Sequence, residues 1–497
     1  MALRRIFFYL SIILLTACSS PPDEALKMGL ANAPSTLDPR LATDATSERI
    51  NRLLYQGLVD FDADGRPVPS LAGWERQRPT HYRFTLNKDR RDFHHGSRLT
   101  ARDVQATFEF ILDPVNASPH RTALSVIERI ETPNSEQIDF YLSRPAPLFP
   151  SYLGIGIVPA DLAAASHPFN DRPVGSGPFR FVDWPVQGQL ILQRLADDRR
   201  FEFLQVKDPN VRVMKLLRGE IDMTQNDLPP ELLDYLADRK EIRVARGPGT
   251  NFSYLGFNLE EAVTGKLLVR RAIAHAIDRE AIIEYLMQGG ARPAQALFPP
   301  DHWAGGRELM PYNFDPEQAK SLLQQAGFDA QRPLELVYKT SSDPFRIRIA
   351  TIIQSQLAQV GIRTEVRSYD WGTFFGDVKA GRFQLYGLTW VGIKTPDIFR
   401  YVFHSESLPP GGANRGRYRS TRADELIETA EKTVDPGLQA PIYRELQALL
   451  LEELPYIPLW YEDQVFACRA DIRGYEIAAD GNYDGLLKVE RGGESTR

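Results

Sequence analysis

Residues 334–390 read LELVYKTSSDPFRIRIATIIQSQLAQVGIRTEVRSYDWGTFFGDVKAGRFQLYGLTW. The first five residues of this stretch predict a strand. Asp343 followed by Pro344 is typical of a helix N-terminus, where the aspartate caps the first turn and the proline takes the first helical position. Apolar residues then recur every three or four positions, which predicts one buried helix face, and Gly361 marks the end of the helix.

The second half of the stretch adds a further strand, helix and strand. Residues 362–369 predict a strand, 370–380 a short helix, and 382–390 a strand that is apolar at nearly every position, as in a parallel sheet covered on both faces. The order is β-α-β-α-β, which indicates an α/β fold. Ligands of open α/β sheets bind beyond the carboxyl ends of the strands, so we expect the loop after Trp390 to line a ligand site.

The N-terminus has the three parts of an export signal. Two arginines precede an apolar run of about ten residues, which is too short to span a bilayer but suits a signal peptide. The sequence LTAC at 15–18 resembles the lipobox of bacterial lipoproteins. We therefore expect a signal peptide over 1–17, a lipid on Cys18 and a tether over 18–25. The alternative is an ordinary secretory signal with an incidental cysteine.

Composition indicates an ordinary globular protein of more than one domain. At 497 residues the chain exceeds what one core usually holds, so two or three domains are expected. A net charge of −6 gives no indication of nucleic-acid binding. There are two cysteines. If Cys18 carries a lipid, Cys468 has no partner for a disulfide, and its strand-like surroundings predict a small buried residue.

The sequence gives no positive support for an enzyme. It lacks a Gly-x-Ser-x-Gly elbow, a His-Glu-x-x-His helix, a P-loop, a Cys-x-x-Cys pair and a Gly-x-Gly-x-x-Gly loop. The adjacent His94 and His95 are typical of a turn. We therefore expect no catalytic residue, no cofactor and no metal site.

Ten segments, in order and at matching spacing, resemble the family 5 extracytoplasmic solute-binding proteins of bacterial ABC importers, which bind dipeptides, oligopeptides or nickel. Each segment alone is a weak signal, but together they are highly specific, and the order and spacing hold from about Leu26 to the 480s. The segments are 51–74 (NRLLYQGLVDFDADGRPVPSLAGW), 82–86 (YRFTL), 93–96 (FHHG), 99–104 (LTARDV), 173–179 (PVGSGPF), 257–258 (FN), 269–279 (VRRAIAHAIDR), 315–327 (DPEQAKSLLQQAG), the tryptophan at 390, and 411–418 (GGANRGRY).

The resemblance implies a two-lobed fold of the periplasmic-binding-protein type, class II, in which the lobes close on a ligand by a hinge. The family's partners are the permease and ATPase subunits of an importer, and a monomer is expected. The implied division is lobe 1 from 26–45, 173–258 and 466–490, an extra subdomain of lobe 1 over 46–172, and lobe 2 over 259–465.

Most of the matching residues have a structural explanation. Residues 269–283 predict an amphipathic helix whose polar side carries Arg270, Arg271, Asp278 and Arg279. Such residues define an architecture without identifying a ligand.

Two charged anchors of the peptide-binding relatives are absent. In those relatives an aspartate three positions after the tryptophan equivalent to Trp390 pairs with the peptide ammonium, and this chain has Ile393 there. An ungapped alignment of 346–390 places their carboxylate-binding arginine at Thr340. A buried ammonium without a counter-charge would cost several kcal/mol, so a free dipeptide held in the usual way is not expected.

Four other residues are candidates near the expected cleft. Lys394 and Asp397 lie in the loop after Trp390, and Trp390 ends the last strand. Asn32, after the first strand, occupies a position that lines the pocket in the family. The alternative for Trp390 is a residue of the core.

The segment 411–418 supplies three further candidates, Asn414, Arg415 and Arg417. It resembles a Gly-x-Asn segment that faces the cleft in the family. In extended backbone the two arginines would point into one groove, and arginine suits bidentate capture of a carboxylate or phosphate. The alternative is a solvated loop with two surface arginines.

The sequence thus predicts a lipid-anchored solute-binding protein of an ABC importer. Its ligand would be a peptide held without the ammonium–aspartate pair. The alternatives are a sugar, opine, glutathione-like or metal-chelate ligand, or a periplasmic sensor or chaperone without a transporter. Ser19 after Cys18 favours the outer membrane, if the cell has one.

Overall fold

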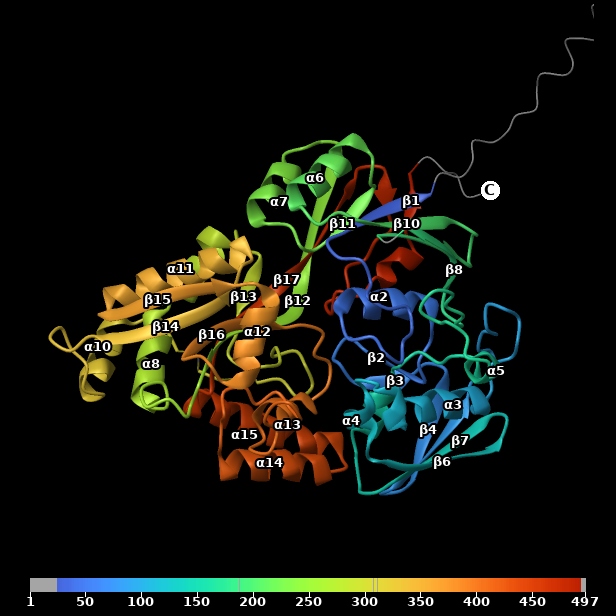
Figure 1. Ribbon diagram of the computed structural model, residues 1–497, viewed down its shortest axis with the longest axis horizontal. Coiled ribbons are helices and arrows are strands. Elements are labelled where there is room, and N and C mark those ends of the chain that lie inside the picture. Colours follow the sequence, from blue (N-terminus) through green and yellow to red (C-terminus); the bar gives the residue numbers. More distant parts are fainter. Residues whose placement is uncertain (1–24, 187, 307, 311, 493–497) are drawn as a thin grey trace, which may run out of the picture.

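The computed structural model describes residues 25–186, 188–306, 308–310 and 312–492. One mixed sheet of eleven strands runs through two lobes, in the order β15-β14-β16-β12-β17-β11-β1-β10-β9-β8, with β13 paired to β17. Two long strands, β12 (Ile242–Phe257) and β17 (Tyr456–Arg469), extend through the centre of the molecule and belong to both lobes (Figure 1).

The ladder between β12 and β17 is interrupted where the lobes meet. Residues 242–247 pair with 464–469, and after a shift of register 251–256 pair with 456–462. Such an irregularity bends a strand locally. The interruption separates the part of the ladder that belongs to lobe 1 from the part that belongs to lobe 2.

Lobe 1 combines a half-sheet with helices and the C-terminal end of the chain. Its core gathers residues from Leu26 to Val489, which are far apart in sequence. Its elements are β1 (Leu26–Leu30), α2 (Ala45–Leu54), α5 (Ala160–Ala164), β8 (Phe179–Val186), β9 (Gln189–Arg194), β10 (Arg200–Gln205), α6 (Pro209–Arg218), β11 (Met223–Gln225), α7 (Pro230–Ala237), β18 (Ile472–Arg473), η4 (Asp484–Leu487) and β19 (Glu490–Arg491).

The extra subdomain has its own four-stranded antiparallel sheet, in the order β4-β5-β7-β6. It lies below lobe 1 in Figure 1 and is covered by α3. Its elements are β2 (Val59–Phe61), β3 (Pro67–Pro69), β4 (Ala72–Arg78), β5 (His81–Leu86), α3 (Ala101–Leu112), η1 (Pro114–Asn116), α4 (Arg121–Leu124), β6 (Ile127–Asn134), β7 (Gln137–Leu142) and η2 (Phe149–Leu153).

Lobe 2 carries the other half-sheet and two groups of helices. Its elements are α8 (Leu267–Ala276), α9 (Arg279–Ala281), η3 (Ile282–Leu286), β13 (Ala291–Pro293), α10 (Pro316–Gln325), β14 (Leu334–Ser341), α11 (Pro344–Gln359), β15 (Ile362–Tyr369), α12 (Trp371–Ala380), β16 (Leu385–Trp390), α13 (Ile398–Phe403), α14 (Thr421–Lys432) and α15 (Pro436–Glu453). Helices α13–α15 gather at the lower end of this lobe in Figure 1.

The stretch 334–390 folds as β14-α11-β15-α12-β16, in agreement with the prediction. The carboxylate of Asp343 accepts the backbone N–H of Arg346, and Gly361 adopts a φ of 91° after the helix. Strand β14 pairs in parallel with both β15 and β16. The last strand begins at Leu385, three residues later than expected, because α12 ends with a left-handed turn at Gly381.

The cores of lobe 1 and its subdomain are separate. The subdomain core runs from Leu58 to Ile157. Ile50 and Phe169, which fall within the expected range 46–172, pack in the lobe 1 core instead. The described subdomain is therefore narrower than that range, because α2 and the residues that follow α5 cover the sheet of lobe 1.

The prediction that Arg270 and Arg279 lie on the polar side of a helix over 269–283 is wrong. Arg270 and Arg279 are buried, and their guanidinium groups donate to backbone carbonyls of Glu453 and Pro458 respectively, among others. Burial lowers the pKa of both side chains. Helix α8 ends at Ala276, so Arg279 belongs to a separate turn and is directed inward.

Candidate ligand-binding site

Strand β16 ends at the edge of the sheet where ligands are expected. Because β14 and β16 are parallel, their carboxyl ends, at Ser341 and Trp390, lie at the same edge. The chain leaves this edge through the loop 391–397, which turns at Gly392 with a φ of 71° and leads into α13.

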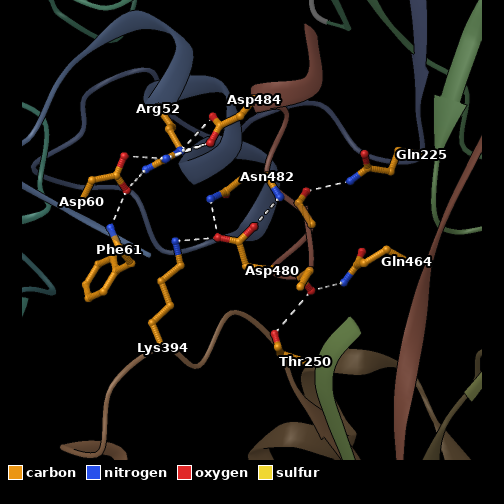
Figure 2. A network of polar contacts seen from close by, with 12 residues as sticks. Arg52, Asp60, Phe61, Gln225, Thr250, Lys394, Gln464, Asp480, Asn482 and Asp484 are labelled. Atoms are coloured by element: carbon orange, nitrogen blue, oxygen red, sulfur yellow. Dashed lines mark hydrogen bonds and ion pairs between the residues drawn. The ribbon is translucent and has the colours of Figure 1, made fainter. Parts of the chain in front are cut away.

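Lys394 in this loop reaches across to lobe 1. Its Nζ lies 2.8 Å from Oδ2 of Asp480 and 5.3 Å from the ring centroid of Phe61 (Figure 2). Asp480 also accepts hydrogen bonds from the backbone and side chain of Asn482. Burial would raise the pKa of Asp480, but the charge of Lys394 and these hydrogen bonds outweigh it and hold the pKa below its ordinary value. Lys394 therefore joins the two lobes.

A second contact lies beside the first. Nε2 of His302, in lobe 2, is 3.0 Å from the carbonyl oxygen of Lys394. The backbone N–H of Trp303 donates to the carbonyl of Asp64, in the subdomain, at 3.3 Å. Gly65 fits against His302 so closely that a Cβ there would lie 2.4 Å from the ring nitrogen. In this structure the subdomain and lobe 2 are thus in contact at the 391–397 loop.

Asp397 and Ile393 contact other residues of lobe 2. Asp397 precedes α13 and accepts a hydrogen bond from the hydroxyl of Thr395. Burial raises the pKa of Asp397 to about 6, and the nearby charge of Glu431 contributes. Ile393 packs against the apolar cluster around α13–α15.

Trp390 and Arg415 stack on one another. The guanidinium carbon of Arg415 is 4.7 Å from the ring centroid of Trp390 and 5.0 Å from that of Phe375. Trp390 in turn stacks on Tyr254, with 6.4 Å between centroids and 16° between ring planes. The indole N–H of Trp390 is buried and has no hydrogen-bond partner within the described part of the chain. Trp390 is half-buried: one part of it packs against the apolar core, as the core interpretation expected, and the rest remains accessible, as the site interpretation requires.

Arg415 differs from the other buried arginines. It is 9% exposed, and the one hydrogen bond of its guanidinium within the described residues goes to the hydroxyl of Tyr254 at 3.3 Å. The nearby hydroxyl groups raise its pKa although burial lowers it. Every other buried arginine donates to two or more carboxylate or carbonyl oxygens: Arg40, Arg90, Arg194, Arg212, Arg270 and Arg279. Arg415 therefore keeps unused donors and a positive charge without a carboxylate.

The expectation that Arg415 and Arg417 point into one groove is wrong. Arg417 has a φ of 59°, so the backbone is not extended there, and its guanidinium donates to the carbonyl of Lys379 at the end of α12. Asn414 is 1% exposed, and its amide bonds the backbone of His404 and Tyr418. These two side chains hold the segment in place, while Arg415 alone enters the aromatic stack.

Asn32 lies on the other lobe. It is exposed and follows β1, whose parallel partners β10 and β11 end at the same edge of the lobe 1 half-sheet. No hydrogen bond or ion pair joins its side chain to the lobe 2 candidates within the described residues.

A cavity of about 170 Å³ opens at the carboxyl ends of β14 and β16. It is smaller than the roughly 300–1,000 Å³ of typical ligand pockets. Hydroxyl groups and aromatic rings form most of its wall. The lining residues are Ser253, Tyr254, Tyr338, Thr340, Ser341, Arg346, Ile349, Trp371, Phe374, Gly387, Leu388, Thr389, Leu459 and Trp460.

An ion pair stands beside this cavity. Nη1 of Arg346 lies 2.8 Å from Oε1 of Glu462 on β17, and the hydroxyl groups of Ser253 and Thr389 donate to the same oxygen at 2.7 and 3.3 Å. Burial raises the pKa of Glu462, but Arg346 and the two hydroxyls more than compensate and leave it below its ordinary value. Both groups are therefore charged.

The cavity lies at the edge where the sequence predicted a ligand site, but the sequence did not point to Arg346, Ser253, Thr389 or Glu462. The hydroxyl residues at the ends of β14 and β16 were a usable signal, because strand ends were expected to line the site. Glu462 gave no such signal, since it lies inside the long strand β17.

Comparisons with known proteins extend these observations. The model for the middle region of bacterial extracellular solute-binding proteins, family 5, matches residues 37–407. Di/tripeptide-binding protein 2 of Pseudomonas aeruginosa (strain UCBPP-PA14) is 28% identical over 94% of this chain and 96% of its own length.

Two solved structures are similar over nearly the whole chain. The periplasmic binding protein DppA from Helicobacter pylori, in complex with the peptide STSA, is 26% identical with a TM-score of 0.79, over 94% of this chain and 98% of its own. The binding protein AgaA from A. tumefacien R10, in complex with agropinic acid, is 26% identical with a TM-score of 0.78, over 95% and 99%. The two-lobed α/β fold is thus confirmed, and so is the expectation of a binding protein that is not an enzyme. This chain belongs to the bacterial extracellular solute-binding proteins of family 5.

Proposed function

We propose that this protein is the extracytoplasmic binding component of an ABC importer, which holds a solute between its lobes and delivers it to the permease and ATPase subunits. The observation that carries the proposal is the juxtaposition, in a family 5 chain, of a cavity at the edge of lobe 2 with contacts that join lobe 2 to lobe 1. A ligand that touches both lobes stabilises their contact.

The proposed ligand is a peptide held without an ammonium–aspartate pair, or a non-peptide solute. Ile393 packs in an apolar cluster, and Thr340 is 2% exposed and lines the cavity. Neither residue supplies the charge that a free dipeptide needs. Similar structures hold a peptide in one case and agropinic acid in another, so the fold accommodates both classes.

The seven candidate residues divide by position. We propose that Trp390 and Arg415 contact the ligand, because both touch Tyr254, which lines the cavity. We also propose that Lys394 stabilises the contact between the lobes, because it pairs with Asp480. Asn32, which is exposed on lobe 1, would contact the ligand from the opposite lobe. Asp397, Asn414 and Arg417 hold the 391–397 and 411–418 segments in position.

We also propose a lipid anchor. The signal peptide over 1–17, Cys18 and the tether over 18–25 lie outside the described residues, apart from residue 25. No helix in the described ranges is long and apolar enough to cross a membrane. A lipid on Cys18 would hold a monomer at the membrane surface, and Ser19 favours the outer membrane in a cell that has one.

Native mass spectrometry of protein purified without unfolding tests the proposal. The expected result is a single retained solute that is lost on unfolding and whose uptake by cells requires both this protein and a permease. A retained free dipeptide would contradict the interpretation of Ile393 and Thr340. Solute binding without any effect on uptake would favour a sensor instead.

A further inference from the structure

Among the described residues, Arg346 is the single charged side chain that lines the cavity at the ends of β14 and β16. The rest of the wall consists of hydroxyl, aromatic and aliphatic groups. Thr340 lines the same cavity from β14, and Arg346 enters it from the first turn of α11. The charge that is absent at 340 is therefore present in the same cavity, delivered from a neighbouring element.

The guanidinium of Arg346 is oriented but not saturated. Nη1 donates to Glu462 at 2.8 Å, whereas Nη2 reaches the second carboxylate oxygen only at 3.5 Å. The described residues give the guanidinium no other hydrogen-bond partner, so several of its five N–H donors remain free. Its side chain is 34% exposed, compared with 21% for Glu462. The carboxylate of Glu462 orients the guanidinium of Arg346, and the exposed part of that guanidinium faces the cavity.

Of the two arginines at or behind this cavity, one has a carboxylate partner and the other has none among the described residues. Arg346 and Glu462 neutralise one another. Arg415 lies behind Tyr254, which lines the cavity, and its guanidinium bonds the hydroxyl of that tyrosine without any carboxylate partner among the described residues. Buried charges are normally paired. One additional negative charge in the cavity would balance this group.

Among the described residues, the wall offers no carboxylate to an ammonium. No aspartate or glutamate is among the lining residues, and the oxygen of Glu462 that faces Ser253 and Thr389 already accepts three hydrogen bonds. A free amino terminus entering the cavity would lose its hydration without gaining a counter-charge. At about 170 Å³ the cavity is also smaller than a typical ligand pocket of roughly 300–1,000 Å³, so it suits one end of a ligand.

We infer that Arg346 is the carboxylate anchor of this protein, and that the ligand is a carboxylic acid without a free amine near the bound end, such as an amine-blocked peptide that enters by its C-terminus. Glu462 acts as a positioning residue that holds the arginine fork. Trp371, 58% exposed beside Phe375, provides an aromatic surface for the part that remains outside. This inference rests on the proposed function and specifies the ligand class of its site.

Three matched probe sets test the ligand class by native mass spectrometry and calorimetry: N-acetylated dipeptides, the same dipeptides with a free amine, and the N-acetylated dipeptides as C-terminal amides. The expected result is that members of the first set bind at least tenfold more tightly than their counterparts in both other sets. Equal binding of the amides would overturn the carboxylate anchor, and equal binding of the free amines would overturn the amine exclusion.

Variants separate binding from folding. Arg346→Gln is expected to weaken acetylated-dipeptide binding about 100-fold, but it leaves Glu462 unpaired. Arg346→Met combined with Glu462→Gln removes both charges and keeps the fold, and it should lose binding to the same extent. Arg363→Gln changes an exposed arginine of lobe 2 and should bind as wild type. Wild-type affinity in the double variant would show that the pair is only structural.

The two proposals fail differently. If the purified protein retains a solute that lacks a carboxylate, the inference is overturned and the proposed function stands. If the protein retains no solute, and neither the probes nor a solute library binds, both are overturned.

Discussion

The ion pair between Lys394 and Asp480 predicts how strongly the lobes hold together before a ligand binds. At 2.8 Å and an effective dielectric constant of about 20, the Coulomb attraction is about 6 kcal/mol. The two side chains are 27% and 24% exposed, so the cost of removing them from water cancels most of it. Exposed pairs contribute about 0.2–1 kcal/mol, and we expect about 1–2 kcal/mol here, with up to about 1 kcal/mol more from the contact with Phe61.

Lys394→Met keeps most of the side-chain stem and removes the charge. Asp480 retains its hydrogen bonds from Asn482, so the variant does not leave it without partners. We expect the ratio of contacting to separated lobes to fall about tenfold, since 1.4 kcal/mol is a factor of ten. Asp480→Asn should have a similar effect, and the double variant should add little more, because both substitutions remove the same interaction.

Single-molecule FRET without ligand measures this ratio. Dyes on cysteines introduced at the exposed Val115 of the subdomain and Gln324 of lobe 2 report the separation, because the native Cys468 is buried. Lys488→Met is the matched control, since Lys488 also lies 2.8 Å from a carboxylate but entirely within lobe 1. If Lys394→Met gives the same distribution as this control, the pair does not hold the lobes together and the reasoning is refuted.

Three further predictions concern single side chains. Arg415→Met should lower the melting temperature slightly, because it removes the stacking of the guanidinium on Trp390 and Phe375, while calorimetry shows solute affinity at least tenfold weaker; unchanged affinity would remove Arg415 from the site. Asp397→Asn should stabilise the protein at pH 8 and not at pH 4, because a pKa raised to about 6 gives stability that is present below about pH 4 and lost as the pH rises through 6. A shift of about two units corresponds to at most about 3 kcal/mol in the free energy of unfolding, measured by thermal unfolding. An equal gain at both pH values would contradict the raised pKa. Cys18→Ala should abolish metabolic labelling with a palmitate analogue and release the protein from membranes, whereas persistent labelling would place the lipid elsewhere.

Local signals in the sequence were sufficient for the five elements of the stretch 334–390. Asp343 and Gly361 define the ends of α11 through a cap and a left-handed turn, and both effects act within a few residues. The parallel pairing then followed from the apolar character of β16. The expected location of the site, beyond Trp390, depended only on these elements.

The sequence could not show which of Arg415 and Arg417 enters the aromatic stack beside Trp390. Arg415 and Arg417 are two residues apart and of one type, yet the left-handed backbone at Arg417 sends its side chain to α12 and leaves Arg415 against Trp390. Similarly, Arg270 appeared to belong to a polar helix face but satisfies backbone carbonyls in the interior. Each outcome depends on residues distant in sequence, which local periodicity does not contain.

The two charged contacts at this edge of lobe 2 have different strengths and therefore different tasks. A contribution of about 1–2 kcal/mol from Lys394 and Asp480 changes the balance between lobe arrangements by roughly tenfold and does not determine it. To move a two-state equilibrium from 1:99 to 99:1 requires about 5.5 kcal/mol of preferential binding. If closure is to report the presence of a solute, most of that energy must come from the ligand. Arg346 is suited to this, because its partner Glu462 lies on β17, the strand that continues from lobe 2 into lobe 1 beside the interrupted ladder. A ligand carboxylate on Arg346 would thus act directly next to this interruption, while Lys394 stabilises the arrangement that the ligand has selected.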